Sequence, residues 1–431
     1  MTKRLLLGNY EADLNPPLKL PIEYSADQKM LGFNDRLYAK AISLHYSDTR
    51  VLIVSVDVVA ATNDICNEIR IEAENRYSIP RSNIVILATH THSSPDTSIW
   101  PITYTQFDEE STKGLYEFKQ NLKKSILYAL NESMRHEEEV LSVFHSTTEC
   151  HGLFTNRDEP TRPIDDSITS LFFKTHTKSL LFVNHNAHPT VLGSNNRGYS
   201  ADFPGVIAKR VVERLGVDQV NCITGSCADV SVRQTLGDNS SVQRSLENAK
   251  RYGAIMGDLV ANSFSKASSI FDYELEATSK QVSLEVKQHP DPEEAKNIKA
   301  TLEEKLKNTT SAIDRIRIEP AIRGVDMWVR ALELNHGRIP RTLELDIGAV
   351  YIGKEKFVLT WAPGEIFSYT GMKIKKQSKF ELTMVSGYGN GYAGYFPNSE
   401  AYENLEYEAT STPMAESAHK VVEEAMLGLV S

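Results

Sequence analysis

Two groups of histidines follow predicted strands and could bind a metal ion. His90 and His92 come directly after the apolar run 83–89, and His185 and His188 close a second predicted strand. Side chains two residues apart on an extended segment share one face, so His90 and His92 could bind one ion together, or one could bind while the other acts on a substrate. Because α/β sheets bind ligands at the carboxyl ends of their strands, both groups are candidates, with polar loop histidines as the alternative.

Glu365, Ser231 and a cluster of tyrosines offer further chemistry. Glu365 follows a Pro–Gly turn, where a carboxylate could bind zinc or stabilise the N-terminus of a helix. Ser231 follows another predicted strand and could be a nucleophile, although no G-x-S-x-G turn surrounds it and helix capping is the alternative. Phenols among glycines can donate protons or bind oxyanions, or pack a surface loop. The cluster contains Tyr388, Tyr392, Tyr395, Tyr402 and Tyr407.

Alternating strands and helices would position these side chains. The Val-rich run 50–61 is typical of a strand buried on both faces, and 62–78 follows it with apolar residues at helical spacing. This alternation predicts an α/β fold with a mixed sheet, and without a visible boundary we expect one domain over 1–431. Glu and Lys interleave in 291–335, which predicts a solvated helical excursion. Further strands are predicted over 83–89, 168–175, 179–187 and 219–226. Helices are predicted over 116–136 and 240–266, and a third, capped by Asp202 with Pro204 in its first turn, runs through 207–215. After 342 the pattern predicts two strands, a helix and a last strand.

The composition of the chain argues against several classes of partner. The chain has 431 residues, 41% of them hydrophobic, and a formal net charge of −10. Nucleic acids and anionic membranes attract basic proteins, so neither is expected as a main partner. No apolar run approaches the ~20 residues of a transmembrane helix, and the first apolar run is too short for a signal peptide, so we predict a cytoplasmic protein. The 4 cysteines have no zinc-finger spacing and are expected to be buried free thiols.

Taken in this order, the segments resemble the neutral/alkaline non-lysosomal ceramidase family, from about residue 5 to about residue 410. The resemblance is carried by GNYEADLNPP, THTHSSPD, NRDEPTRPIDD, NAHPTVLG, APGEIF and GNGYAGYFPNSEAY. It implies a mixed-sheet α/β catalytic domain like the N-terminal domain of the neutral ceramidases, with one catalytic zinc ion (Zn2+). We expect a short member of the family, without the C-terminal immunoglobulin-like domain of the full-length enzymes.

The resemblance also implies which residues bind the zinc ion. The first histidine of the THTH motif corresponds to His90, and the histidine of the HPT motif corresponds to His188, which favours it over His185. The glutamate of the PGE motif matches Glu365, and the zinc tyrosine of the family matches Tyr395. Two imidazoles, a carboxylate and a phenolate, together with a water, are a plausible ligand set for zinc.

Residues around the reacting group carry over in the same way. The second THTH histidine is His92, the arginine of the NR motif is Arg157, and the tyrosine twelve residues beyond the zinc tyrosine is Tyr407. The family serine falls on Ser231, but the surrounding sequence reads ADVSVR instead of the family's GDxSPN. We therefore expect Ser231 to orient substrate or water instead of forming an acyl-enzyme, with His92 as the proton shuttle and Arg157 and Tyr407 as oxyanion donors.

The resemblance predicts a zinc-dependent amidohydrolase that cleaves a linear amide (N-acyl) bond by attack of a metal-activated water. A small-molecule or lipid amide would be its substrate. The first alternative is a metal-dependent hydrolase of a small ester, lactam or peptide-like metabolite. The second is a binding or scaffold protein that lacks metal and catalysis.

Overall fold

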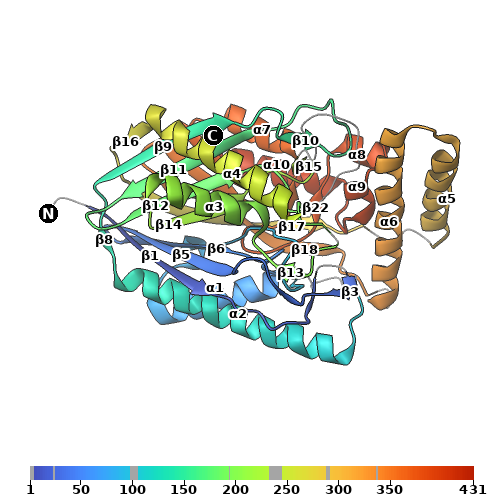
Figure 1. The fold of residues 1–431 in the computed structure, drawn as a ribbon, viewed down its shortest axis with the longest axis horizontal. Helices are drawn as coiled ribbons and strands as arrows, with labels where there is room; N and C mark the ends of the chain where they lie inside the picture. The colour runs from blue at the N-terminus through green and yellow to red at the C-terminus, as the bar shows by residue number, and fades with distance from the viewer. Residues whose placement is uncertain are drawn as a thin grey trace.

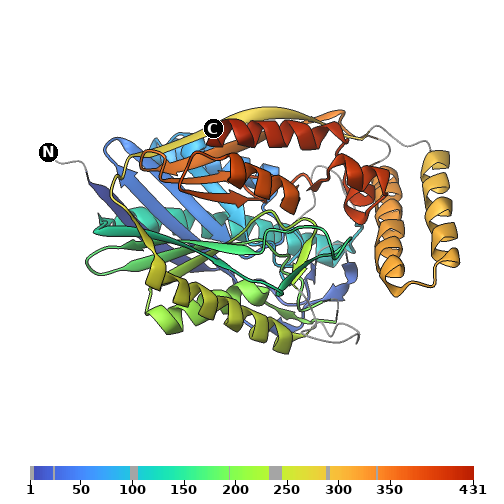
Figure 2. The ribbon, with the colours of Figure 1, turned by 90° about the horizontal axis from the view of Figure 1, so that it is seen from above.

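The computed structural model describes residues 4–22, 25–97, 105–193, 195–232, 245–287, 292–335 and 338–431. These residues form three main β-sheets, each covered by helices, around a shared apolar core (Figures 1 and 2). The mixed α/β fold predicted from the sequence is confirmed. Part of the predicted helix 240–266, namely 240–244, lies outside the described residues. Organisation as one domain over 1–431 stays a prediction.

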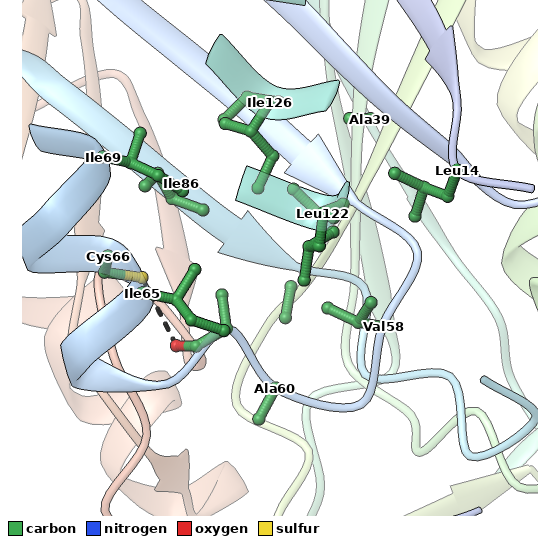
Figure 3. Packing of buried hydrophobic residues seen from close by; sticks show 14 of the residues in the cluster. Leu14, Ala39, Val58, Ala60, Ile65, Cys66, Ile69, Ile86, Leu122 and Ile126 are labelled. Atoms are coloured by element: carbon green, nitrogen blue, oxygen red, sulfur yellow. Dashed lines mark hydrogen bonds between the residues drawn. The ribbon is translucent and has the colours of Figure 1, made fainter. Parts of the chain in front are cut away.

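The first sheet has the strand order β7-β6-β5-β1-β8, and the helices α1 and α2 run along one of its faces (Figure 1). Leu122 and Ile126 of α2 pack with Ile69 of α1 and Ile86 of β7 in a buried cluster (Figure 3). The sheet consists of β1 (Leu5–Asp13), β5 (Tyr38–Tyr46), β6 (Thr49–Val56), β7 (Ile84–Ala88) and β8 (Glu138–Glu139), and the helices are α1 (Asn63–Tyr77) and α2 (Glu109–Arg135).

Replacing Ile126 with alanine is expected to lower the free energy of unfolding by about 3 kcal/mol, because buried carbon atoms are lost and a cavity remains. The Ile126 side chain is fully buried in this cluster. Chemical denaturation measures the change. Lys124, which is exposed on the same helix, provides the control, since Lys124→Ala should change the stability by less than about 0.5 kcal/mol. Equal losses in the two variants would contradict the packing shown in Figure 3.

The second and third sheets repeat this arrangement. The second sheet, β14-β12-β11-β9-β16, is covered by α3 and α4, and the third, β17-β18-β19-β21, by α7 and α10. The strands are β9 (Ser142–Glu149), β11 (Ser167–Lys174), β12 (Ser179–His185), β14 (Gln219–Thr224), β16 (Ser268–Ile270), β17 (Leu275–Glu285), β18 (Thr342–Ile352), β19 (Phe357–Trp361) and β21 (Leu382–Ser386). The helices are α3 (Asp202–Leu215), α4 (Leu246–Ser263), α7 (Ser368–Gln377) and α10 (Ser417–Val430).

The three sheets share one core, to which each contributes apolar side chains from the face opposite its helices. Ile53 comes from the first sheet, Phe182 from the second and Trp361 from the third, and all three are buried. Each sheet also contains one parallel strand pair, namely β6–β7, β12–β14 and β19–β21. The fold thus brings the carboxyl ends of strands from three separate layers toward a common region.

Two helices protrude from this body as a hairpin, α5 (Pro292–Asn308) and α6 (Ala312–Leu334), seen at one end of the molecule in Figures 1 and 2. They correspond to the predicted excursion 291–335, and α6 packs against α9 (Tyr407–Ser411). Among the described residues, no helix has the length and apolar character needed to cross a bilayer. The remaining short strands and α-helix are β2 (Pro21–Ile22), β3 (Ser25–Lys29), β4 (Gly32–Phe33), β10 (Phe154–Asn156), β13 (Gly198–Tyr199), β15 (Val230–Val232), β20 (Glu365–Ile366), β22 (Tyr395–Phe396) and α8 (Ser399–Glu403).

Candidate metal centre and active site

Hydrogen bonds tie the carboxyl ends of strands from the three sheets together. The hydroxyl of Thr224, at the end of β14, donates to the carbonyl of Thr89 just beyond β7 at 2.7 Å. The hydroxyl of Ser386, at the end of β21, donates to the carbonyl of Thr224 at 2.9 Å. Gly225 permits this approach, because a Cβ there would lie 3.0 Å from the Val385 carbonyl oxygen and closer still to Asn186. The segments that follow these strands therefore meet.

Three imidazoles and one carboxylate converge where these segments meet. The Nε2 atom of His90 lies 3.2 Å from Nε2 of His188 and 3.2 Å from Nε2 of His92. The Oε2 atom of Glu365 lies 3.1 Å from Nε2 of His188 and 3.7 Å from Nε2 of His90. His90, His188 and Glu365 are buried, and His92 is half-buried. We call these four residues the imidazole cluster.

The protonation of two of these imidazoles follows from their backbone contacts. The Nδ1 atom of His90 lies 2.6 Å from the carbonyl oxygen of Val59, and Nδ1 of His188 lies 2.8 Å from that of Cys227. A carbonyl oxygen only accepts, so both Nδ1 atoms carry the proton and both Nε2 atoms of the neutral rings present a lone pair. Burial lowers the pKa of His90 well below its usual value, which favours this neutral form. Two lone pairs facing each other at 3.2 Å, with a carboxylate oxygen beside them, fit a bound cation.

Glu365 is held in place by two tyrosines. The Tyr392 hydroxyl donates to Oε1 of Glu365 at 2.6 Å, and the Tyr388 hydroxyl donates to Oε2 at 3.1 Å. Burial raises the pKa of Tyr388 well above its usual value, so this phenol stays protonated and remains a donor. Glu365 lies in β20, and α7 begins only at Ser368, so helix capping, the alternative considered for this glutamate, does not describe its position.

The backbone at the cluster is strained. His90 has a φ of 62° and Tyr388 a φ of 60°, in the left-handed region that non-glycine residues seldom occupy. Their rings stack with centroids 4.0 Å apart. Such strain persists only where the surrounding structure enforces it, and it concentrates at functional sites.

Tyr395 and Arg157 lie next to the imidazole cluster. Tyr395 pairs directly with Glu365 in the parallel strands β20 and β22, so their side chains leave the same face. Nη2 of Arg157 donates to the Tyr395 hydroxyl at 3.2 Å, and Nε of Arg157 donates to Oε1 of the buried Glu408 at 2.6 Å. Burial, followed by the charge of Glu365, raises the pKa of Tyr395 well above its usual value. Ionisation of this phenol would therefore require a further cation besides Arg157.

Tyr407 and Ser231 complete the set of predicted residues. The Tyr407 ring packs edge-on against the Tyr395 ring, with centroids 5.9 Å apart, and its hydroxyl contacts the sulfur of Met327 in α6 at 4.0 Å. Ser231 lies beside His188 through a backbone bridge between the two residues. All eight residues implied by the resemblance thus lie in one region, although their roles stay predictions.

Solved structures provide a comparison for the whole chain. The structure of neutral ceramidase from Pseudomonas aeruginosa superposes with a TM-score of 0.77 at 15% sequence identity, covering 100% of this chain and 74% of that one. A structure of ceramidase complexed with C2 superposes with a TM-score of 0.75 at 14% identity, covering 99% of this chain and 75% of that one. The chain has the neutral ceramidase fold. No family model matches the sequence, and no curated protein matches it significantly.

Within the neutral ceramidase fold of this chain, His185 lies apart from the cluster. Its ring packs against Phe203 with centroids 4.9 Å apart, and its Nε2 lies 3.4 Å from the Thr224 hydroxyl. Burial lowers the pKa of His185 to about 3. This histidine is a buried core residue, which agrees with the choice of His188 that the resemblance favours.

The acidic residues around Arg157 were not predicted from the sequence. Glu408 directly follows Tyr407, and its carboxylate is fully buried against the Arg157 guanidinium. Asp158 directly follows Arg157, and its carboxylate lies close to those of Glu406 and Glu408. Burial, followed by the charge of Glu408, raises the pKa of Asp158 well above its usual value. The adjacency of charged residues to Arg157 and Tyr407 was the only signal that could have drawn attention to them.

Proposed function

We propose that this protein is a zinc-dependent hydrolase that cleaves an amide (N-acyl) bond by attack of a metal-activated water. The observation that carries the proposal is the convergence of Nε2 lone pairs from His90 and His188 on one carboxylate oxygen of Glu365. The neutral ceramidase fold supports it independently. The predicted cytoplasmic location is a separate proposal that neither observation addresses.

The donor set favours zinc over the hard divalent cations. Calcium and magnesium select oxygen ligands, whereas zinc accepts imidazole nitrogen with one carboxylate. His90, His188 and Glu365 would hold the ion, with Tyr395 as the fourth ligand. His92 offers a third imidazole, whose Nε2 lies as far from Nε2 of His90 as Nε2 of His188 does. We assign His92 to proton transfer instead of metal binding, because it is the half-buried member of the cluster.

Zinc bound there would supply Lewis acidity, which activates a water for attack on an amide carbonyl. Arg157 lies beside Tyr395 and can donate hydrogen bonds to the oxygen on which negative charge develops. The Tyr407 ring lies next to both Tyr395 and Arg157, and it would form a wall beside the oxygen that Arg157 contacts. His92 can pass a proton to the leaving nitrogen, and Ser231 can orient the substrate beside His188.

Metal removal provides the test. The purified protein should contain about one zinc per chain and hydrolyse N-acyl substrates. Dialysis against a chelator should abolish hydrolysis, and zinc should restore it while magnesium does not. Elemental analysis and a substrate series from acetyl to palmitoyl amides provide the measurements, with matched esters and lactams alongside.

The outcomes separate the alternatives. Faster turnover of long acyl amides indicates a lipid substrate, and faster turnover of short polar amides indicates a soluble metabolite. Faster turnover of the esters or lactams than of the amides would favour the first alternative, a metal-dependent hydrolase of a small ester, lactam or peptide-like metabolite. Protein that binds no zinc and gains no activity from it would overturn the proposal and favour a scaffold.

A further inference from the structure

A cavity of about 340 Å³ lies between the α5–α6 hairpin and the segment α8–α9. No residue of the imidazole cluster lines it. Its walls are mainly apolar and its volume falls within the range of about 300–1,000 Å³ that small-molecule sites occupy. The walls include Ile298, Val325, Trp328, Tyr402, Leu405 and Lys287. We call it the Lys287 cavity.

Lys287 is the cation of this cavity. Its ammonium donates to the carbonyl of Ala409 and lies 5.8 Å from the centroid of the Trp328 ring and 5.6 Å from that of Tyr402. An ammonium group has three donors, so this hydrogen bond leaves two of them for another acceptor. No carboxylate of the described part of the chain forms an ion pair with Lys287. Burial lowers the pKa of Lys287 to about 7, as expected for a cation without an anionic partner.

Trp328 belongs to the same wall. The indole N–H of Trp328 is buried and has no acceptor among the described residues. The part of Trp328 that faces the cavity is therefore its aromatic ring, and the hydrogen-bond donors come from Lys287. Glu294 and Glu416 also line the cavity, and within the described part of the chain neither forms an ion pair with Lys287.

The charge and the walls define the ligand. One lysine balances one negative charge, and Glu294 and Glu416, which also line the cavity, disfavour a dianion such as phosphate. The apolar side chains on the other walls require an apolar body. We propose that the Lys287 cavity binds a small monocarboxylic acid with an apolar chain, whose carboxylate contacts Lys287. This site is separate from the imidazole cluster and does not depend on the proposed hydrolysis.

Titration calorimetry with octanoate tests the charge recognition in the full-length protein. Octanoate should bind more tightly than octan-1-ol and octylamine, which share its chain but not its charge. Lys287→Met keeps most of the apolar stem and removes the ammonium, so the Kd for octanoate should rise about 10- to 100-fold. Lys307→Met, on the exposed surface of α5, is the matched control and should leave the Kd unchanged.

Crystals of the unmodified protein soaked with 8-bromooctanoate locate the ligand even if Lys287→Met fails to fold. The anomalous bromine signal should lie among Ile298, Val325 and Leu405, with the carboxylate at Lys287. Bromine found only at the imidazole cluster, or nowhere, would overturn the proposal. An octanoate Kd that is equal in Lys287→Met and the unmodified protein would also overturn it. The same holds if the soaked ligand is seen in the crystal but calorimetry detects no binding, because it is then an adventitious additive only.

Discussion

The Glu365→Gln variant should lose its bound zinc and at least about 1000-fold of its kcat/KM, which corresponds to about 4 kcal/mol of transition-state stabilisation. The substitution removes the negative charge beside two imidazole lone pairs. It also disrupts the contacts with Tyr388 and Tyr392, because both phenols donate to the carboxylate, whereas an amide has only one acceptor oxygen. Elemental analysis and steady-state kinetics on the N-acyl substrate measure the two losses.

Glu423→Gln provides the matched control for this variant. Glu423 is a buried carboxylate that pairs with Lys373 in the contact between α10 and α7, away from the imidazole cluster. The Glu423→Gln variant should keep its zinc and its activity. A Glu365→Gln protein with full zinc content and near-normal turnover would refute the proposed metal centre.

The Arg157→Met variant should lose about 100- to 1000-fold in kcat while it keeps its zinc, because it removes a preorganised donor for the developing oxyanion. It should also unfold more easily. Glu408 is fully buried, and without the guanidinium its charge would have no partner, which costs about 3–5 kcal/mol. Kinetics, zinc content and chemical denaturation give three independent readouts.

The double variant Arg157→Met/Glu408→Gln separates catalysis from folding. Neutralising Glu408 removes the unpaired charge, so the double variant should recover most of the stability lost by Arg157→Met. Its kcat should stay low, because no donor has been restored beside Tyr395. Recovery of activity together with stability would show that Arg157 acts only by pairing with Glu408.

Local patterns predicted those parts of the fold that depend on local interactions. The strand at 84–88 and the helix at 63–77 follow from a buried apolar run and from helical spacing after Thr62. The helix predicted from residue 116 begins at Glu109 in the structure, because Asp108 caps it by accepting from the Ser111 N–H. Apolar spacing could not reveal this first turn, since its residues are charged or small and polar.

The site was predictable only in part, because its contacts join residues that lie far apart in the sequence. Both histidine groups were visible as polar residues at strand ends, but spacing alone could not separate His185 from His188. The end of β12 separates them, because His185 is still part of the strand and its ring packs against Phe203, whereas the loop after β12 brings the His188 ring to His90. The bond between Arg157 and Glu408 joins residues 251 positions apart, and no local period encodes such a pair.

The sharing of the imidazole cluster among three layers has a consequence for how the protein matures. His90 follows a strand of the first sheet, His188 follows one of the second, and Glu365 follows one of the third. A nascent or truncated chain that lacks any one layer could not assemble the full ligand set. The protein would therefore bind the metal only after all three layers have folded and packed together. Because the ion binds the folded state alone, it would stabilise the packing of all three layers.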